Sequence, residues 1–159
     1  MRVSIICLMM ILVITSSCSK TELYEEELTA ITLENSDTAI EIEFFELVNM
    51  YRAERGLSRL KYNNQAKAYT VEHNLYMISK NEISHDNFIK RSSKLSVDIH
   101  ATRISENVGR NFTTAQGLFE AFLASDSHLK NIEGDFVETA ISVYVDNDGA
   151  FYLTQVFIK

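Results

Sequence analysis

Two β-rich runs near the C-terminal end constrain the fold more than any other feature of the chain. Residues 139 to 145 and 151 to 158 flank the stretch Asp146-Asn147-Asp148-Gly149, which is typical of a hairpin turn. The first run carries apolar side chains on both of its faces: Ala140, Ile141, Val143, Tyr144 and Val145. A strand with one face in water would alternate apolar and polar residues, so the pattern predicts a sheet that helices cover on both faces.

Helical periodicity accounts for most residues in the first half of the domain. A capping box of Thr38 and Glu41 predicts a helix start, Arg52 lies in the last turn, and Gly56 ends the helix. A second helix is predicted from near Asn64. The apolar stripes that predict burial are Ile40, Phe44, Leu47, Val48 and Tyr51 in the first helix and Ala68, Val71, Leu75 and Ile78 in the second.

The middle of the chain is less regular. Residues 81 to 93 are polar, and a short helix is expected over residues 94 to 100, followed by a strand over residues 103 to 108. A second capping box, Thr113 with Gln116, predicts a further helix with a phenylalanine-rich face. The order of helices, strand, helix and hairpin indicates an α+β fold.

Composition excludes one large class of partners. Apolar residues make up 46% of the 159 residues, which is enough for a packed core, and the net charge is -7 at pH 7. A chain this acidic, with no basic stripe, does not suit nucleic-acid binding through phosphate contacts.

The N-terminus is typical of an export signal. Arg2 precedes an apolar run from Val3 to Ile14, which is too short to span a bilayer, and small residues lead directly to Cys18. Small residues before a cysteine resemble the bacterial lipobox, although Thr15 stands where an aliphatic residue is usual. The alternative is ordinary signal cleavage beside an incidental cysteine. Cleavage after residue 17 would leave Cys18 as the only cysteine, so a disulfide framework is excluded and lipidation is favoured.

The predicted organisation therefore has three parts. Residues 1 to 17 form a lipoprotein signal peptide, residues 18 to 36 form the lipidated cysteine with an acidic tether, and residues 37 to 159 form the folded domain. Acidic residues close behind the cysteine resemble export signals of outer-membrane lipoproteins. The expected location is the bacterial cell envelope, at the outer membrane or the cell surface, with the lipid on Cys18 as the membrane contact.

Five motifs in order resemble those of one family. Residues 47 to 60, LVNMYRAERGLSRL, are similar to the opening N-x-x-R-x-x-x-G-L-x-x-L of bacterial CAP domains, also called SCP-like. ISH at 83 to 85 resembles the first histidine segment, and SEN at 105 to 107 resembles the G-E-N signature. FLASDSHLKN at 122 to 131 is similar to W-x-x-S-x-x-H-x-x-N, and YLTQVF at 152 to 157 to the closing strand.

The resemblance implies an α-β-α sandwich of CAP/SCP type, with a small and mainly antiparallel sheet covered by helices on both faces. It also implies a shallow cleft lined by histidines and glutamates. His85 matches the first cleft histidine and Glu106 the first cleft glutamate, with Asn107 beside it. His128 matches the histidine that is typical of the bacterial branch.

Several positions depart from the family pattern. Animal and plant members take a second histidine from the closing strand, where this chain has Tyr152, and their second glutamate corresponds roughly to Ser125. Ser105 replaces the usual glycine, and Phe122 replaces the tryptophan. The four-residue histidine and glutamate set is incomplete, and Tyr152 and Ser125 are expected to border the cleft.

Glu106 interrupts an apolar strand, and a buried carboxylate must be paired, solvated or used. One interpretation is that it accepts hydrogen bonds and braces the strand. Another is that His85, Glu106 and His128 converge on a zinc ion, since histidine and carboxylate ligands with one open position suit zinc. Catalysis is a third. Of the other histidines, His73 is expected on the solvated side of its helix, and His100 has no evident partner.

Two classes of function follow. The first is a membrane-anchored, non-enzymatic binding module for a small ligand, lipid, glycan, peptide or other envelope component. The second is a metal-assisted hydrolase acting on envelope or extracellular polymers, which the incomplete acid/base set disfavours. Metal content of the purified protein separates the two.

Overall fold

The computed structural model describes residues 38–146 and 151–159. The predicted signal peptide, Cys18, the acidic tether and most of the hairpin turn lie outside the described residues. Within these two ranges, no helix combines the length and the apolar character that crossing a membrane requires.

A four-stranded mixed sheet forms the middle layer, in the order β1-β3-β4-β2. The hairpin prediction is confirmed, because β3 (Glu138–Val145) pairs antiparallel with β4 (Phe151–Ile158). β2 (Ile104–Arg110) pairs antiparallel with β4, and the short β1 (Lys61–Tyr62) pairs parallel with β3. β2 is therefore an edge strand of this sheet.

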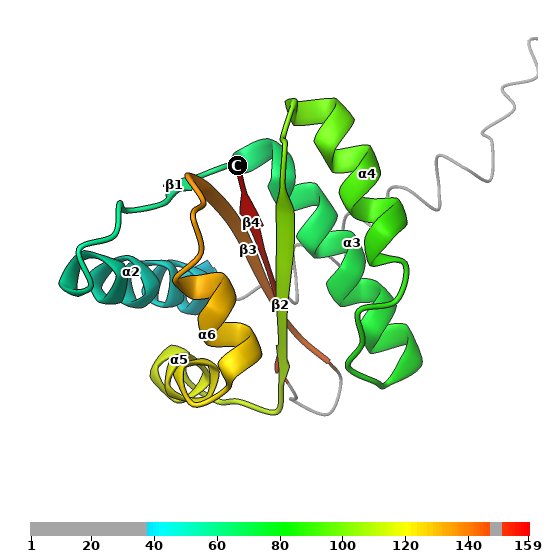
Figure 1. Cartoon of the computed structure of the whole chain (residues 1–159). Coiled ribbons are helices and arrows are strands. Elements are labelled where there is room, and N and C mark those ends of the chain that lie inside the picture. The colour runs from blue at the N-terminus through cyan, green and yellow to red at the C-terminus, as the bar shows by residue number, and fades with distance from the viewer. Residues whose placement is uncertain (1–37, 147–150) are drawn as a thin grey trace, which may run out of the picture.

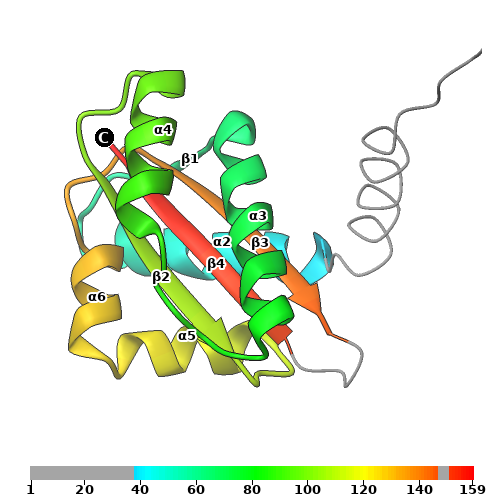
Figure 2. The same cartoon turned by 90° about the vertical axis from the view of Figure 1, so that its right-hand side faces the viewer.

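Helices cover both faces of the sheet, so the predicted α-β-α sandwich is confirmed (Figures 1 and 2). α3 (Asn64–Lys80) and α4 (Phe88–Ile99) lie on one face. α2 (Thr38–Glu54), α5 (Ala115–Leu123) and α6 (Asp126–Ile132) lie on the other.

The face that carries α2, α5 and α6 is the apolar one. Phe44 of α2 meets the rings of Phe119 and Phe122 edge-on, with centroid separations of 6.4 and 5.7 Å. Ile141 and Leu153 of the sheet pack into the same cluster. Burial of these large side chains is the main stabilising contribution of this layer.

Glu41 and Arg52 are polar residues of α2 that are buried and hold other segments in place. Glu41 accepts a hydrogen bond from the Val143 backbone N–H at 3.0 Å and pairs with the Lys67 ammonium at 2.6 Å. The Glu41 carboxylate therefore binds β3 and Lys67 and does not cap its own helix, so the predicted capping-box role for Glu41 is wrong. Arg52 is 2% exposed and donates to the carbonyls of Ile132 and Gly134 at 2.6 and 2.9 Å. Arg52, the arginine of the first family motif, therefore connects α2 to the end of α6 and to the loop that follows it.

The buried face of α3 differs from the predicted apolar stripe. The residues that face the sheet are Ala66, Thr70, His73, Asn74 and Met77, whereas Ala68 is exposed. The physical reason is that the opposing sheet face is polar as well. Asn74 donates to the Ser142 carbonyl at 2.8 Å and accepts from the Thr154 hydroxyl at 2.6 Å. Polar groups that satisfy one another can be buried at little cost.

Three element boundaries also differ from the prediction. α4 begins at Phe88, inside the stretch expected to be irregular, and Leu95 is its one buried residue. β2 continues to Arg110, beyond the predicted end at residue 108. The cap of α5 is Thr114, whose hydroxyl accepts from the Gly117 N–H at 3.1 Å, one residue after the predicted Thr113.

Candidate functional site

Glu106 is paired. It lies in β2 on the sheet face that α3 and α4 cover, and its side chain is 2% exposed. The Arg91 guanidinium of α4 donates one nitrogen to both carboxylate oxygens, at 2.7 and 3.0 Å. His85, in the loop between α3 and α4, places Nδ1 2.9 Å from Oε1. An ion pair with further hydrogen bonds is the arrangement that makes a buried carboxylate tolerable.

His73 of α3 is the third neighbour of this carboxylate, contrary to the expectation that it is solvated. Its side chain is fully buried, and Nε2 lies 3.7 Å from Oε1 of Glu106. The same Nε2 is 2.8 Å from the Ser84 carbonyl, which can only accept, so Nε2 carries the proton. Burial lowers the pKa of His73, and the charge of Arg91 acts in the same direction. At neutral pH the ring is therefore uncharged.

The electrostatic balance at Glu106 favours the ionised form. Burial alone would raise the pKa of Glu106, but hydrogen bonds from His85 and Arg91 and the positive charge of Arg91 outweigh it and hold the pKa below its ordinary value. The carboxylate is thus a charged, almost fully enclosed group.

The ring of His128 makes its closest aromatic contact with Phe122. It stacks on Phe122 with a centroid separation of 4.2 Å and an interplanar angle of 3°. Among the residues that the structure describes, its Nδ1 is buried without a hydrogen-bond partner, and burial lowers the pKa of His128. The hydrogen bonds of the Glu106 carboxylate go to His85 and Arg91, so the structure joins His85 to Glu106 but does not add the His128 ring to that network.

Asn107 connects the segment of His128 to the strand of Glu106. Its amide nitrogen donates to the His128 backbone carbonyl at 3.2 Å. Asn131 of α6 donates to the Asn107 side-chain oxygen at 2.8 Å and to the Glu106 carbonyl at 3.2 Å. These two asparagines fasten α6 along the edge strand β2, which otherwise would present unpaired backbone groups.

Ser125 and Tyr152 lie outside the carboxylate cluster. Ser125 precedes α6 without a side-chain capping bond, and its hydroxyl lies 3.1 Å from that of Ser127. Tyr152 is fully buried in β4 and pairs in register with Arg110, at the opposite end of β2 from Ile104. The Arg110 guanidinium lies 4.7 Å from its ring centroid. Tyr152 therefore packs in the sheet interior and does not border Glu106.

Arg91 and His73 are the site residues that sequence reasoning missed. Arg91 lies four residues before the buried Leu95 and so on the inner side of α4, but that helix was not expected to begin so early. His73 stands between two polar residues, and only the polar nature of the whole α3 face explains its burial.

The cluster does not suit a zinc ion as it is folded. Within the described part of the chain, no group of three or more histidine, cysteine, aspartate or glutamate side chains is arranged to hold a metal ion. The Arg91 guanidinium already covers both carboxylate oxygens of Glu106, and a cation there would meet it at close range. The predicted set of His85, Glu106 and His128 would have to rearrange to bind zinc.

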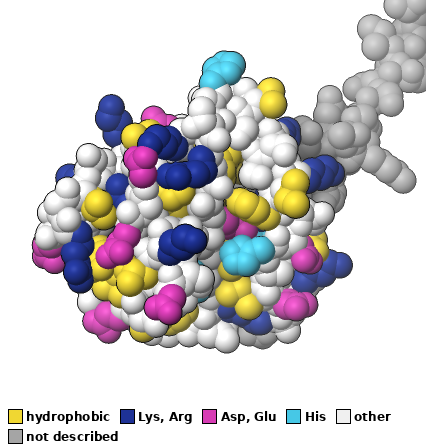
Figure 3. All heavy atoms as spheres, in the orientation of Figure 1, with side chains coloured by type: hydrophobic (Ala, Val, Ile, Leu, Met, Phe, Trp, Pro, Cys, Tyr) yellow, Lys and Arg dark blue, Asp and Glu magenta, His cyan; other side chains and the backbone are white. Residues whose placement is uncertain are grey.

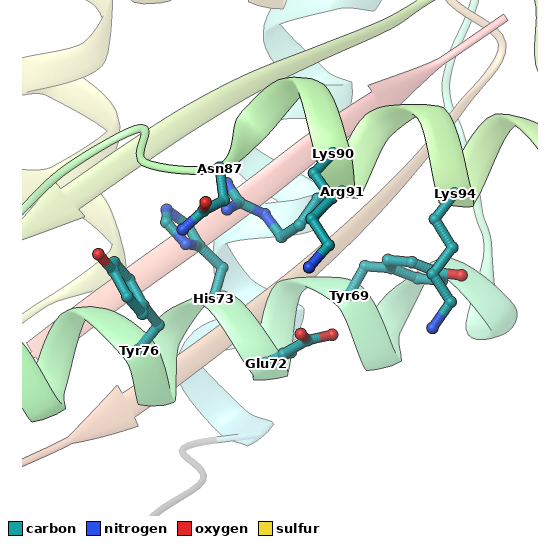
Figure 4. Close-up of a pocket in the computed structure, with 8 residues that line it drawn as sticks. All are labelled: Tyr69, Glu72, His73, Tyr76, Asn87, Lys90, Arg91 and Lys94. Carbon is teal, nitrogen blue, oxygen red and sulfur yellow. The ribbon is translucent and has the colours of Figure 1, made fainter.

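His85 is the accessible member of the cluster. Its side chain is 55% exposed, and with Nδ1 engaged by Glu106 the other ring nitrogen is available to a ligand. On the molecular face that Figure 3 draws, histidine side chains reach the surface among hydrophobic, basic and acidic ones. His73 and Arg91 also line a pocket of about 300 Å³ between α3 and α4 (Figure 4).

Comparison with known proteins identifies relatives of this architecture. Residues 45–157 match the model of the cysteine-rich secretory protein family, abbreviated CAP. No curated protein sequence matches the chain. An outer surface protein from Borrelia burgdorferi has a TM-score of 0.69 at 17% identity, over 77% of this chain and 95% of that one.

Two further solved structures are longer proteins. A cysteine-rich secretory protein from Staphylococcus aureus gives a TM-score of 0.63 at 23% identity, over 76% of this chain and 38% of that one. An extracellular protein containing a SCP domain from Bacillus anthracis gives 0.66 at 23% identity, over 77% and 41%. At these identities the similarity shows a shared fold and assigns no activity.

Proposed function

Because the chain belongs to the cysteine-rich secretory protein (CAP) family, we propose that it is an exported, lipid-anchored binding module of the bacterial envelope and has no catalytic activity of its own. The anchor would be the lipid on Cys18, and residues 19 to 36 would hold the domain away from the membrane. The ligand would be a small envelope component.

The observation that carries the proposal is the enclosure of Glu106. A general base or a metal ligand must reach the reacting group or the ion. The Glu106 side chain is 2% exposed, and its oxygens are already used by Arg91 and His85. A carboxylate in this state stabilises the junction of β2, α4 and the His85 loop, and it is poorly placed to take a proton from a substrate.

Support for an extracytoplasmic location comes from two independent sources. The similar structures are described as an outer surface protein, a secretory protein and an extracellular protein. The N-terminal run that ends at Cys18 has the order of charge, apolar residues and small residues that export signals share.

The test compares the purified wild type with Glu106→Gln. We expect less than stoichiometric zinc in both proteins and no release of soluble products from cell-wall or polysaccharide substrates, with or without added zinc. Glu54→Gln, exposed at the end of α2, serves as the matched control, because it removes a carboxylate away from the cluster. Hydrolysis by the wild type that Glu106→Gln abolishes and the control retains would replace this proposal with the metal-assisted hydrolase.

A further inference from the structure

The pocket between α3 and α4 adjoins the Glu106 cluster and shares two residues with it. Arg91 and His73 line it, but neither offers a ligand an unpaired charge, because Arg91 pairs with Glu106 and His73 is buried and neutral. Its volume of about 300 Å³ falls at the lower end of the range found for small-molecule sites. The remaining lining residues decide what such a pocket would accept.

The α4 wall of this pocket carries two lysines that have no anionic partner among the residues that the structure describes. Lys90 extends from α4 toward α3 (Figure 4) and has no hydrogen bond or ion pair within the described residues. The Lys94 ammonium lies 5.4 Å from the centroid of the Tyr69 ring, a contact that leaves its charge unneutralised. Asn87, at the start of α4, makes no side-chain capping bond, so its amide is also free to donate.

The α3 wall has the opposite character. Glu72 projects from α3 toward the pocket between Tyr69 and Tyr76 (Figure 4), and no ion pair within 4.0 Å engages it among the described residues. The Tyr76 hydroxyl donates to Asp86 at 2.8 Å, and the Tyr69 hydroxyl donates to Asp98. These bonds hold the two rings in place. The Tyr76 ring stacks on His73 at a centroid separation of 6.0 Å, and the Tyr69 ring is the one that the Lys94 ammonium approaches.

The polarity of the two walls selects the ligand. The two lysines would attract a simple anion, but Glu72 would repel it. A simple cation would be attracted by Glu72 and repelled by the lysines. The Glu72 carboxylate, with no ion pair within 4.0 Å among the described residues, can attract an ammonium group. Two ammonium groups and an amide donor suit the several oxygens of a phosphate.

We propose that the α3–α4 pocket binds a small zwitterion of the phosphoethanolamine type, with its phosphate toward Lys90 and Lys94 and its ammonium toward Glu72. The same chemistry could come from a soluble molecule or from a lipid headgroup. The inference rests on the proposed function in taking the chain to be a binding module, but it assigns the ligand to Lys90, Lys94 and Glu72 and not to the Glu106 carboxylate.

The experiment is a titration of the full chain followed by NMR, with three probes. O-phosphoethanolamine carries both charges, inorganic phosphate carries only the anion, and ethanolamine carries only the cation. We expect saturable shifts of α3 and α4 resonances with O-phosphoethanolamine, at least about ten-fold tighter than with either single-charge probe.

Substitutions in each wall of the pocket test which part of the ligand that wall binds. Replacing Lys90 and Lys94 together by glutamine should weaken O-phosphoethanolamine binding by about ten-fold or more. Glu72→Gln should weaken O-phosphoethanolamine binding several-fold, yet leave phosphate binding unchanged or stronger. Lys61→Gln and Glu54→Gln, both exposed and on other elements, are the charge-matched controls and should bind as the wild type does.

Binding to lipid vesicles distinguishes a soluble ligand from a lipid headgroup. Binding to vesicles with phosphatidylethanolamine above that to vesicles of equal charge without it would assign a lipid headgroup; binding to the free probe alone would assign a soluble ligand. The proposal is overturned if no probe shifts the pocket resonances, or if phosphate binds as tightly as the zwitterion to wild type and to Glu72→Gln alike. A hydrolytic activity, in contrast, would overturn the proposed function and leave this site untouched.

Discussion

Replacing Arg91 by methionine tests the role of Glu106 most directly. Methionine keeps the apolar stem of the side chain and removes the guanidinium that donates to both carboxylate oxygens. His85 remains at 2.9 Å, and the buried His73 is neutral, so one hydrogen bond and little positive charge would hold the carboxylate.

The expected loss of stability follows from the enclosure of the pair. Breaking a buried ion pair by removing one partner costs about 3–5 kcal/mol, because the other charge stays buried. The Arg91 side chain is 12% exposed and His85 is retained, so the cost should fall near the lower limit, about 3 kcal/mol at neutral pH. For a domain of this size the melting temperature would fall by roughly 10 °C.

The pH dependence of that loss separates an electrostatic cause from simple repacking. In the wild type the folded pKa of Glu106 lies below its ordinary value, so its stabilising contribution is present above about pH 4.5 and is lost as pH falls through the folded pKa. In Arg91→Met, the effect of burial on the carboxylate is no longer offset, so the pKa of Glu106 in the folded state rises. The variant then loses stability as pH rises through that value, so its deficit is largest near neutral pH and shrinks toward pH 4.

Urea unfolding at several pH values measures the effect, with Lys90→Met as the matched control on the same helix. Lys90 has no ion pair among the described residues, and its replacement should change the free energy of unfolding by no more than about 0.5 kcal/mol. Glu106→Gln combined with Arg91→Met should recover part of the loss, because no charge is then left buried. A deficit under about 1 kcal/mol, or one that does not change with pH, would refute the pairing argument.

Four other outcomes are expected. Cys18→Ala should move the protein from the detergent phase to the aqueous phase, and full retention in detergent would contradict lipidation. Deleting residues 19 to 36 should change the free energy of unfolding by less than about 1 kcal/mol; a larger loss would mean that the segment packs on the domain. Since burial lowers the pKa of His73 and His128 below 6.5, the unfolded chain takes up protons first, so stability should fall as pH drops below about 6.5, and less so in His128→Gln. Asn74→Leu should cost about 2–3 kcal/mol in urea unfolding, because its two sheet partners lose their hydrogen bonds; a neutral result would show that they find others.

The fold was predictable where apolar periodicity reports burial. The hairpin strands and the apolar face of α2 follow that rule, and the structure places them as expected. The rule fails for α3, whose buried side carries Thr70, His73 and Asn74. Ser142 and Thr154 in the two hairpin strands were the available signal, because they put polar groups on the covered sheet face that some polar partner had to meet.

The contacts of the candidate site were predictable only in part, for a different reason. Motif order placed His85 and Glu106 in adjacent segments, and the structure brings them to 2.9 Å. The direction of the His128 ring depends on a side-chain rotamer, and stacking on Phe122 decides it. Arg91 could not be assigned to Glu106 before α4 was known to begin at Phe88, because the guanidinium reaches the strand only from that helix.

Arg91 also explains why the chain can lack the remaining acidic and histidine partners of the family pattern. A carboxylate in an apolar strand requires a compensating charge, and a metal or a second titratable pair could supply one. Here the Arg91 guanidinium supplies it, and its two contacts with the carboxylate help to hold the pKa of Glu106 below its ordinary value. Because the Glu106 carboxylate is already paired in this way, differences in ligand among similar chains should be sought at Glu72, Lys90 and Lys94 of the α3–α4 pocket.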